Sequence, residues 1–167
     1  MSAQRRGAMI ALFPGSFDPP HRGHLELIQR AARLADRLVV AVAVNPDKPP
    51  FLPSEVRVAL LRDALANLGN VTVATYRGGT AAFAASQGAT VLVRGVRGAA
   101  DLDFERGMAA VHRASAGLET VLLAGDGATG HLSSSLVREA ARAGLALDAL
   151  LTPAVAQAVR AALDADA

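Results

Sequence analysis

Two histidines, His21 and His24, stand three residues apart in the stretch GSFDPPHRGH (residues 15–24, the histidine motif). The glycines of this motif permit tight turns and a close approach of the backbone to a ligand, and its prolines stiffen it. A short apolar run over residues 9–13 precedes the motif and an amphipathic segment follows, so it joins a buried strand to a helix. A helix N-terminus attracts anions, and we expect the imidazoles to hold a triphosphate there.

Zinc binding and a purely structural role are the alternatives for the two histidines. The chain has no cysteine, and no third ligand stands at a recognisable spacing, so a zinc site is not expected. Packing alone does not require two histidines separated by Arg22 and Gly23, with a Gly-Ser-Phe-Asp-Pro turn before them. We therefore predict a phosphate-binding role and no metal held by protein side chains.

The histidine motif resembles the G-x-F-D-P-x-H-x-G-H signature of the HxGH nucleotidyltransferase superfamily. Its members transfer a nucleotidyl group from a nucleoside triphosphate to a phosphate or similar acceptor and release pyrophosphate. The resemblance therefore implies an enzyme of this reaction class, and it leaves the acceptor open.

Length and composition favour one domain over residues 1–167. A chain with 51% hydrophobic and 19% charged residues suits an ordinary globular protein with a sizeable core. No segment resembles a secretory signal or an apolar membrane span, so we expect a soluble, cytoplasmic protein without membrane contact. Residues 1–8 are small, polar and basic, and we expect a flexible terminus there.

The basic balance of the chain comes almost entirely from arginine. The isoelectric point is near 9.9, but the formal net charge is only +2 and the arginines form no clustered stripe, so nucleic-acid binding is not expected. Lys48 is the only lysine among 17 basic residues and follows the second apolar run. We interpret it as a compact, mobile charge for a phosphate, with chance placement as the alternative.

Strand and helix patterns alternate along the chain. Strands are predicted over residues 9–13, 38–44, 71–76, 90–93 and 120–123. Helices are predicted over residues 24–35, 54–69, 80–88 and 153–163, with a short helical piece over 145–151. Two more helices are predicted, one after residues 94–105 through about residue 115 and one after residues 131–135 through about residue 143. This alternation predicts an α/β fold: a Rossmann-like, doubly wound parallel sheet of five strands in the order 3-2-1-4-5, with C-terminal helices.

Each segment that carries candidate binding or catalytic residues follows the carboxyl end of a predicted strand. The histidine motif follows the first strand, Lys48 the second, residues 94–97 the fourth and residues 133–135 the fifth. In the predicted order, the first and fourth strands are neighbours at the switch point, where such sheets bind ligands. We therefore expect these residues to converge on one crevice.

The segment RGVRGAADLDFE (residues 94–105) resembles the R-G-L-R-x-x-x-D-x-E-Y-E stretch of the phosphopantetheine adenylyltransferase family, and the motif spacing agrees over nearly the whole chain. This resemblance implies transfer of AMP from ATP to 4′-phosphopantetheine, which gives dephospho-coenzyme A and pyrophosphate in coenzyme A biosynthesis. It also implies that Mg²⁺ is used with ATP, that the protein forms a homohexamer, and that the end product of the pathway inhibits the enzyme.

The same resemblance implies a role for each matching residue. Ser16, Lys48 and Arg94 would hold the acceptor phosphate, and Thr80 stands where the family lines the pantetheine arm. The predicted ATP-binding residues are Gly15, Ser16, Phe17, His21, His24, Gly95, Arg97, Glu105, Ser133, Ser134 and Ser135. His24, Lys48 and Arg97 are the predicted catalytic residues. They would align and stabilise an in-line attack by the anionic acceptor on the α-phosphorus, without a protein nucleophile or general base.

Several alternatives stay open at this level. His21 stands where pyridine mononucleotide adenylyltransferases and small cytidylyltransferases carry histidine, so another acceptor, such as nicotinamide or nicotinate mononucleotide or a polyol phosphate, is the main alternative. A nucleotide-binding regulator without turnover is the second. Glu105 could be a solvated helix charge, and the serine run could cap a helix as well as hold phosphate.

Overall fold

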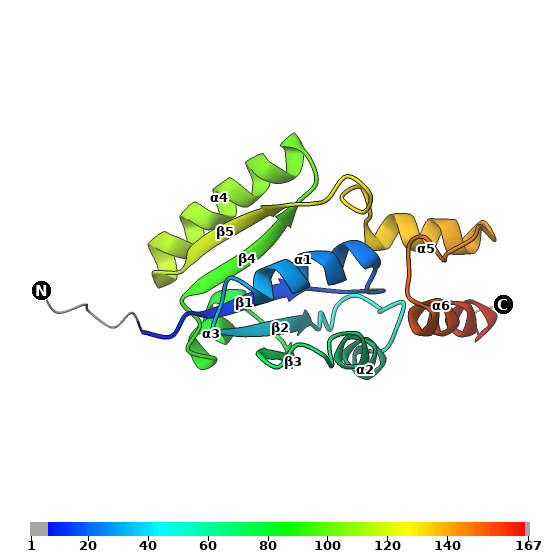
Figure 1. The fold of residues 1–167 in the computed structure, drawn as a ribbon, viewed down its shortest axis with the longest axis horizontal. Coiled ribbons are helices and arrows are strands. Elements are labelled where there is room, and N and C mark those ends of the chain that lie inside the picture. The colour runs from blue at the N-terminus through cyan, green and yellow to red at the C-terminus, as the bar shows by residue number, and fades with distance from the viewer. Residues whose placement is uncertain (1–6, 166–167) are drawn as a thin grey trace, which may run out of the picture.

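The computed structural model describes residues 7–165 as a five-stranded parallel sheet with helices on both faces (Figure 1). The strands are β1 (Ile10–Gly15), β2 (Arg37–Ala43), β3 (Val71–Tyr76), β4 (Val91–Val96) and β5 (Glu119–Ala124). The helices are α1 (Arg22–Ala32), α2 (Ser54–Ala64), α3 (Thr80–Ser86), α4 (Ala99–Ala116), α5 (Ser134–Arg142) and α6 (Pro153–Ala165). The strand order is β3-β2-β1-β4-β5, which confirms the predicted fold class and strand order.

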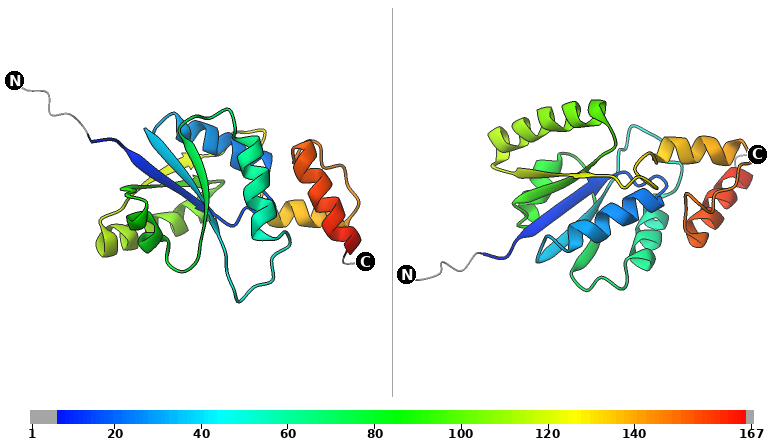
Figure 2. Two further views of the ribbon diagram at one scale, coloured as in Figure 1. Left: turned by 90° about the horizontal axis from the view of Figure 1, so that it is seen from below. Right: turned by 45° about the horizontal axis from the view of Figure 1, so that its top comes forward.

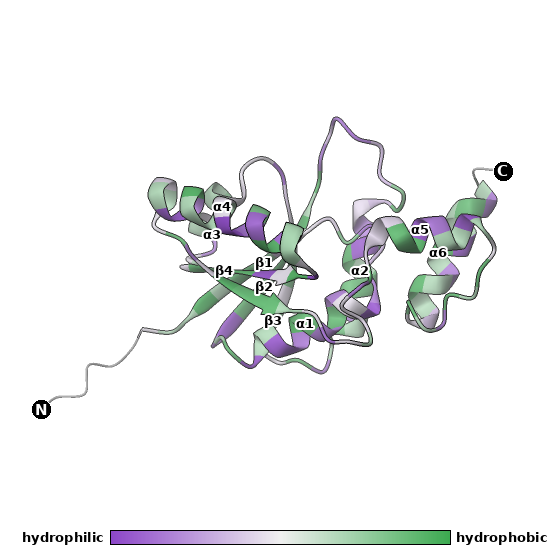
Figure 3. Cartoon of the chain, turned by 90° about the horizontal axis from the view of Figure 1, so that it is seen from above, coloured by the Kyte–Doolittle hydropathy of each residue, from purple (hydrophilic) through white to green (hydrophobic). Residues whose placement is uncertain are grey.

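Both faces of the central strands are buried. Val40 packs with Ile28 of α1 and Leu61 of α2 on one face, whereas its neighbour Val39 packs with Ala84 of α3 on the other. Successive side chains of a strand point to opposite faces, so a strand covered on both sides needs apolar residues throughout. This explains the continuous apolar run of β2, and Figure 3 shows the strands as mainly hydrophobic.

The strands β1 and β4 separate toward their carboxyl ends. They are paired only through Ala11 with Val91 and Leu12 with Leu92, although β1 continues to Gly15 and β4 to Val96. Beyond these pairs the helices leave on opposite sides, α1 after β1 and α4 after β4 (Figure 2). This is the switch point of a doubly wound sheet, where a crevice opens between the strand ends.

The helices α5 and α6 stand beyond the carboxyl ends of the strands (Figure 1). They share an apolar cluster that includes Val137 and Val159, against which Phe51 packs. The helical piece predicted over residues 145–151 is wrong, because this segment forms turns. Leu147 and Leu151 are buried in the same cluster. Their four-residue spacing imitates a helical stripe, although a turn connection places both side chains there.

Several boundaries differ from the prediction. β1 pairs with β2 as far as Gly15 and β4 pairs with β5 as far as Val96, so these residues, expected in loops, lie at strand ends. α2 ends at Ala64 rather than near Gly69. In the described part of the chain, no helix is long and apolar enough to cross a membrane. The flexible terminus predicted for residues 1–8 lies mostly outside the described residues.

Candidate active site

A cavity of about 1030 Å³ lies at the carboxyl ends of the strands, in the size range of small-molecule sites. It brings together every predicted site residue but one: Gly15, Ser16, Phe17, His21, His24, Lys48, Arg94, Gly95, Arg97, Glu105, Ser133, Ser134 and Ser135. The convergence expected at the switch point therefore occurs, while the individual roles of these residues stay predictions.

Thr80 is the exception, since it is not among the described residues that line this cavity. It begins α3, and its hydroxyl lies 3.0 Å from the hydroxyl of Tyr76. The Tyr76 ring in turn stacks on Phe83, with ring centroids 4.9 Å apart. Because α3 follows the edge strand β3, two strands away from β1, Thr80 lies in a local polar and aromatic cluster. Its acceptor-binding role stays a prediction.

His21 and His24 cap the start of α1 reciprocally. His21 is the N-cap residue, and its Nδ1 accepts the backbone N–H of His24 at 3.3 Å. His24 Nδ1 accepts the backbone N–H of His21 at 3.2 Å, and the two rings stack with centroids 3.6 Å apart. These bonds satisfy donors that a helix start leaves free. Because Nδ1 accepts in both rings, each neutral ring carries its proton on Nε2.

Burial keeps both imidazoles neutral near pH 7. Desolvation, followed by the charge of Arg97, lowers the pKa of His21 to about 4. Desolvation, followed by the charges of His21 and Arg97, lowers the pKa of His24 well below its usual value. His24 is therefore a neutral hydrogen-bond donor through Nε2, suited to a phosphate oxygen, and has no free nitrogen to act as a base.

We expect the free energy of unfolding to fall as the pH drops from 6.5 toward 4, because the unfolded chain binds protons first at His21. The stabilisation is complete above the unfolded pKa of 6.5 and is lost as the pH approaches the folded value of about 4. For His21 alone this amounts to roughly 3 kcal/mol.

Urea titrations of the wild type and of His21→Asn across this pH range would measure the effect. Asparagine retains an N-cap acceptor but does not titrate, so the variant should show a flatter dependence. Equal slopes for the two proteins would contradict the assignment.

Tight packing holds His24 in place. Phe17 is fully buried, and its ring meets that of His24 edge-on with centroids 4.9 Å apart. Phe17 has a φ of 49°, a left-handed conformation that non-glycine residues rarely adopt. A Cβ on Gly23 would lie 2.9 Å from the carbonyl oxygen of Thr129 and 3.1 Å from Nδ1 of His21. Glycine is therefore required between the two histidines for steric reasons.

Carboxylates of α4 orient two arginines of the site. Arg94 donates from Nη2 to Glu105 at 2.7 Å and from Nε to both Glu105 oxygens at 3.1 Å. Arg97 pairs with Asp101 at 2.7 Å, and its hydrogen bond lowers the pKa of that carboxyl. Asp101 and Glu105 lie one helical turn apart, so one face of α4 positions both guanidinium groups. Glu105 is buried at 7% exposure, so the solvated-charge alternative is wrong.

The three serines have different partners. Ser133 is the N-cap of α5 and accepts the backbone N–H of Leu136 at 3.1 Å, which confirms the expected cap. Ser134 donates to the carbonyl oxygen of Pro19 at 2.9 Å. Ser135 accepts a hydrogen bond from Arg138 at 3.1 Å. The start of α5 is thus tied to the histidine motif, and its phosphate-binding role stays a prediction.

Asp18 connects the histidine motif to the loop that carries Lys48 (residues 44–52, the Lys48 loop). Its carboxylate accepts the backbone N–H groups of Phe51 and Leu52, both at 2.8 Å. Lys48 itself is exposed and lines the cavity. The two loops are therefore held together at one end, while the Lys48 side chain reaches the cavity from solvent.

Among the lining residues that the sequence analysis did not predict as site residues are Arg57, Phe104, Arg138 and Arg142. Arg138 donates to the carbonyl oxygen of Asp18 at 2.6 Å, and the guanidinium of Arg142 lies 5.9 Å from the ring centroid of Phe51. Arginines on predicted helices resemble ordinary solvated charges, so nothing local marks Arg138 or Arg142. Arg57 was detectable, because it stands one helical turn before Leu61 on the buried face of α2.

Known proteins resemble this chain in sequence. A family model described as cytidylyltransferase-like matches residues 12–140. A phosphopantetheine adenylyltransferase of Synechococcus sp. (strain JA-3-3Ab) is 46% identical over 153 residues, which cover 91% of this chain and 96% of that protein. Another, of Clavibacter michiganensis subsp. michiganensis (strain NCPPB 382), is 48% identical over 158 residues, which cover 92% of this chain and 94% of that protein.

A solved structure resembles it in fold. This protein of Vibrio parahaemolyticus, assigned as a nicotinate-nucleotide adenylyltransferase, matches with a TM-score of 0.67 over 92% of each chain. Its sequence is 20% identical, so the likeness bears on the fold alone.

Proposed function

Because this chain belongs to the phosphopantetheine adenylyltransferase family, we propose that its cavity aligns ATP and 4′-phosphopantetheine for direct transfer. The chain is an adenylyltransferase of coenzyme A biosynthesis: AMP passes from ATP to 4′-phosphopantetheine, and dephospho-coenzyme A and pyrophosphate are the products. One observation supports the mechanism: a neutral Nε2–H donor and three cationic side chains line the same cavity. The donor is His24, and the cations are Lys48, Arg94 and Arg97.

The protein supplies charge and alignment in this mechanism. Ser16, Lys48 and Arg94 hold the acceptor phosphate, which is already anionic at neutral pH and attacks the α-phosphorus in line with the departing pyrophosphate. His24 donates to an α-phosphate oxygen as negative charge builds there, and Arg97 stabilises the same charge. The first turn of α5 offers N–H groups and serine hydroxyls to the β- and γ-phosphates.

We propose that Mg²⁺ enters with ATP. Within residues 7–165, no group of three or more His, Cys, Asp or Glu side chains is placed to hold a metal ion. Mg²⁺ keeps several waters and is commonly bound through substrate phosphates, so the ATP phosphates would supply its ligands. There it would neutralise phosphate charge.

We also propose a cytoplasmic homo-oligomer, with the hexamer of the family resemblance as the expected form. The exposed apolar side chains of α4 support association: Phe104 is 65% and Val111 56% exposed. Light scattering on the purified protein would measure the mass in solution, and a monomer would refute the oligomer.

Pyrophosphate release tests the function directly. We expect release with ATP, Mg²⁺ and 4′-phosphopantetheine, and none without an acceptor or with nicotinamide mononucleotide. Turnover with the pyridine mononucleotide alone would keep the nucleotidyl-transfer chemistry and overturn the acceptor. Tight ATP binding without turnover on any acceptor would favour a regulator.

A further inference from the structure

Arg57 is a buried cation in the wall of the cavity. It lies in the first turns of α2, is only 3% exposed and shares the buried stripe of that helix with Val58 and Leu61. Within the described part of the chain, none of the ion pairs within 4 Å includes it. Its Nε is buried without a hydrogen-bond partner. Among the described residues, no carboxylate therefore lies within ion-pair distance of this guanidinium.

A buried guanidinium of this kind is costly to keep. Arginine does not lose its proton in proteins, so burial cannot neutralise it. Desolvation of a charge is offset only by close counter-charges or by several hydrogen bonds, and a side chain that merely filled this stripe would be apolar, as its neighbours are. Arg57 lines the same cavity as Ser16 and Lys48, so an anion in that cavity is the counter-charge within reach.

The hydrogen bonds of Arg57 indicate which anion this is. Its Nη1 donates to the carbonyl oxygen of Ser16 at 2.6 Å and to that of Ala43 at 3.3 Å. Ser16 follows β1, and Ala43 is the last residue of β2, directly before the Lys48 loop. One guanidinium thus joins the two backbone segments that carry Ser16 and Lys48, both assigned to the acceptor phosphate.

We propose that Arg57 is a positioning residue for the acceptor phosphate. It fixes the segments of Ser16 and Lys48 relative to each other, and its buried charge is balanced when the phosphate of 4′-phosphopantetheine binds. This inference rests on the proposed function for the identity of the acceptor, whereas the unpaired buried charge and the two carbonyl bonds are independent of it.

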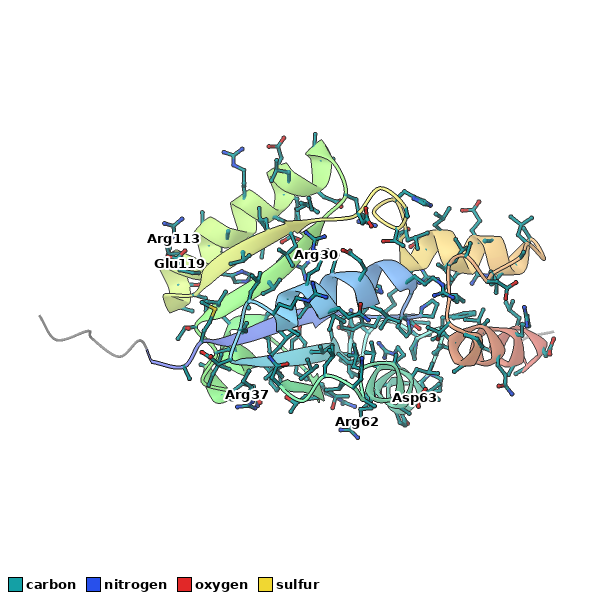
Figure 4. All side chains as sticks on the ribbon, in the orientation of Figure 1. Arg30, Arg37, Arg62, Asp63, Arg113 and Glu119 are labelled. Carbon is teal, nitrogen blue, oxygen red and sulfur yellow. The ribbon has the colours of Figure 1, made fainter. Side chains whose placement is uncertain are left out.

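Arg62 provides a matched control on the same helix. Its Nη2 donates to the carbonyl oxygen of Val73 at 3.1 Å, and it borders a small separate hollow, not the large cavity. Figure 4 shows Arg62 at the outer edge of the molecule, beside Asp63. Arg62→Met therefore removes a helix arginine and a backbone bond without touching the site.

The test compares Arg57→Met, Arg57→Lys and Arg62→Met with the wild type. We expect Arg57→Met to raise the KM for 4′-phosphopantetheine at least about tenfold and to change the KM for ATP less than about threefold. Its Tm should be no lower than that of Arg62→Met, because a buried unpaired charge is removed. Arg57→Lys keeps the charge and should recover most of the lost affinity.

Titration calorimetry with 4′-phosphopantetheine and with pantetheine, which lacks the phosphate, supplies a readout without turnover. Arg57→Met should weaken binding of the phosphorylated compound and leave that of pantetheine unchanged. Equal weakening of both, equal KM changes for both substrates, or a lower Tm with unchanged affinity would overturn the proposal. If the wild type does not turn over 4′-phosphopantetheine, the proposed function is refuted. The role of Arg57 can then still be tested, by comparing the binding of whichever phosphorylated acceptor the protein uses with the binding of its unphosphorylated form.

Discussion

Replacing His24 with alanine is expected to lower kcat by roughly 100- to 1,000-fold while the KM for ATP changes by less than about threefold. The Nε2–H of His24 is fixed by the bond between its Nδ1 and the backbone of His21 and by the Phe17 ring. Such a donor contributes most where charge develops in the transition state, and less to ground-state ATP. Steady-state pyrophosphate release over a range of ATP concentrations would separate the two constants.

Loss of fold has to be distinguished from loss of chemistry in this experiment. His24→Ala also removes one half of the reciprocal cap of α1, so its Tm should be measured alongside. His131→Ala is a suitable control, because His131 is exposed and does not line the cavity. Equal losses in kcat and in ATP affinity would contradict a transition-state role for His24.

Replacing Arg94 with alanine is expected to reduce both stability and activity. The substitution leaves the Glu105 carboxylate buried without its partner, a situation that costs about 3 kcal/mol in the free energy of unfolding. It also removes a predicted ligand of the acceptor phosphate, so kcat/KM for 4′-phosphopantetheine should fall at least about 100-fold. Urea titration and initial-rate kinetics measure the two effects.

The double variant Arg94→Ala/Glu105→Ala separates these effects. Without the unpaired carboxylate most of the stability should return, while the activity should stay low. Arg97→Ala is the matched comparison for stability, because the pair of Arg97 with Asp101 is more exposed and should contribute less than about 1 kcal/mol. A double variant as unstable as Arg94→Ala would refute the argument from the buried carboxylate.

The sequence by itself determined the order of the elements and the place of the site. Alternating apolar runs and helical stripes predicted the parallel sheet, and the motif positions predicted one crevice at the ends of β1 and β4. These inferences succeed because the spacing of apolar residues reports directly which faces are buried, and because parallel strands bring their carboxyl ends to one edge.

Only the tertiary structure decided which groups meet within that crevice. The sequence left a solvated helix charge open as the alternative for Glu105, and the contact with Arg94 excludes it. Arg57 gained its significance from carbonyl groups 41 and 14 residues away in the chain. Thr80 follows a strand as the other site residues do, but its strand lies at the edge of the sheet. The burial of His24 and its nearness to Arg97 lower its pKa, and both depend on residues distant in the chain. The local spacing of residues does not encode such contacts.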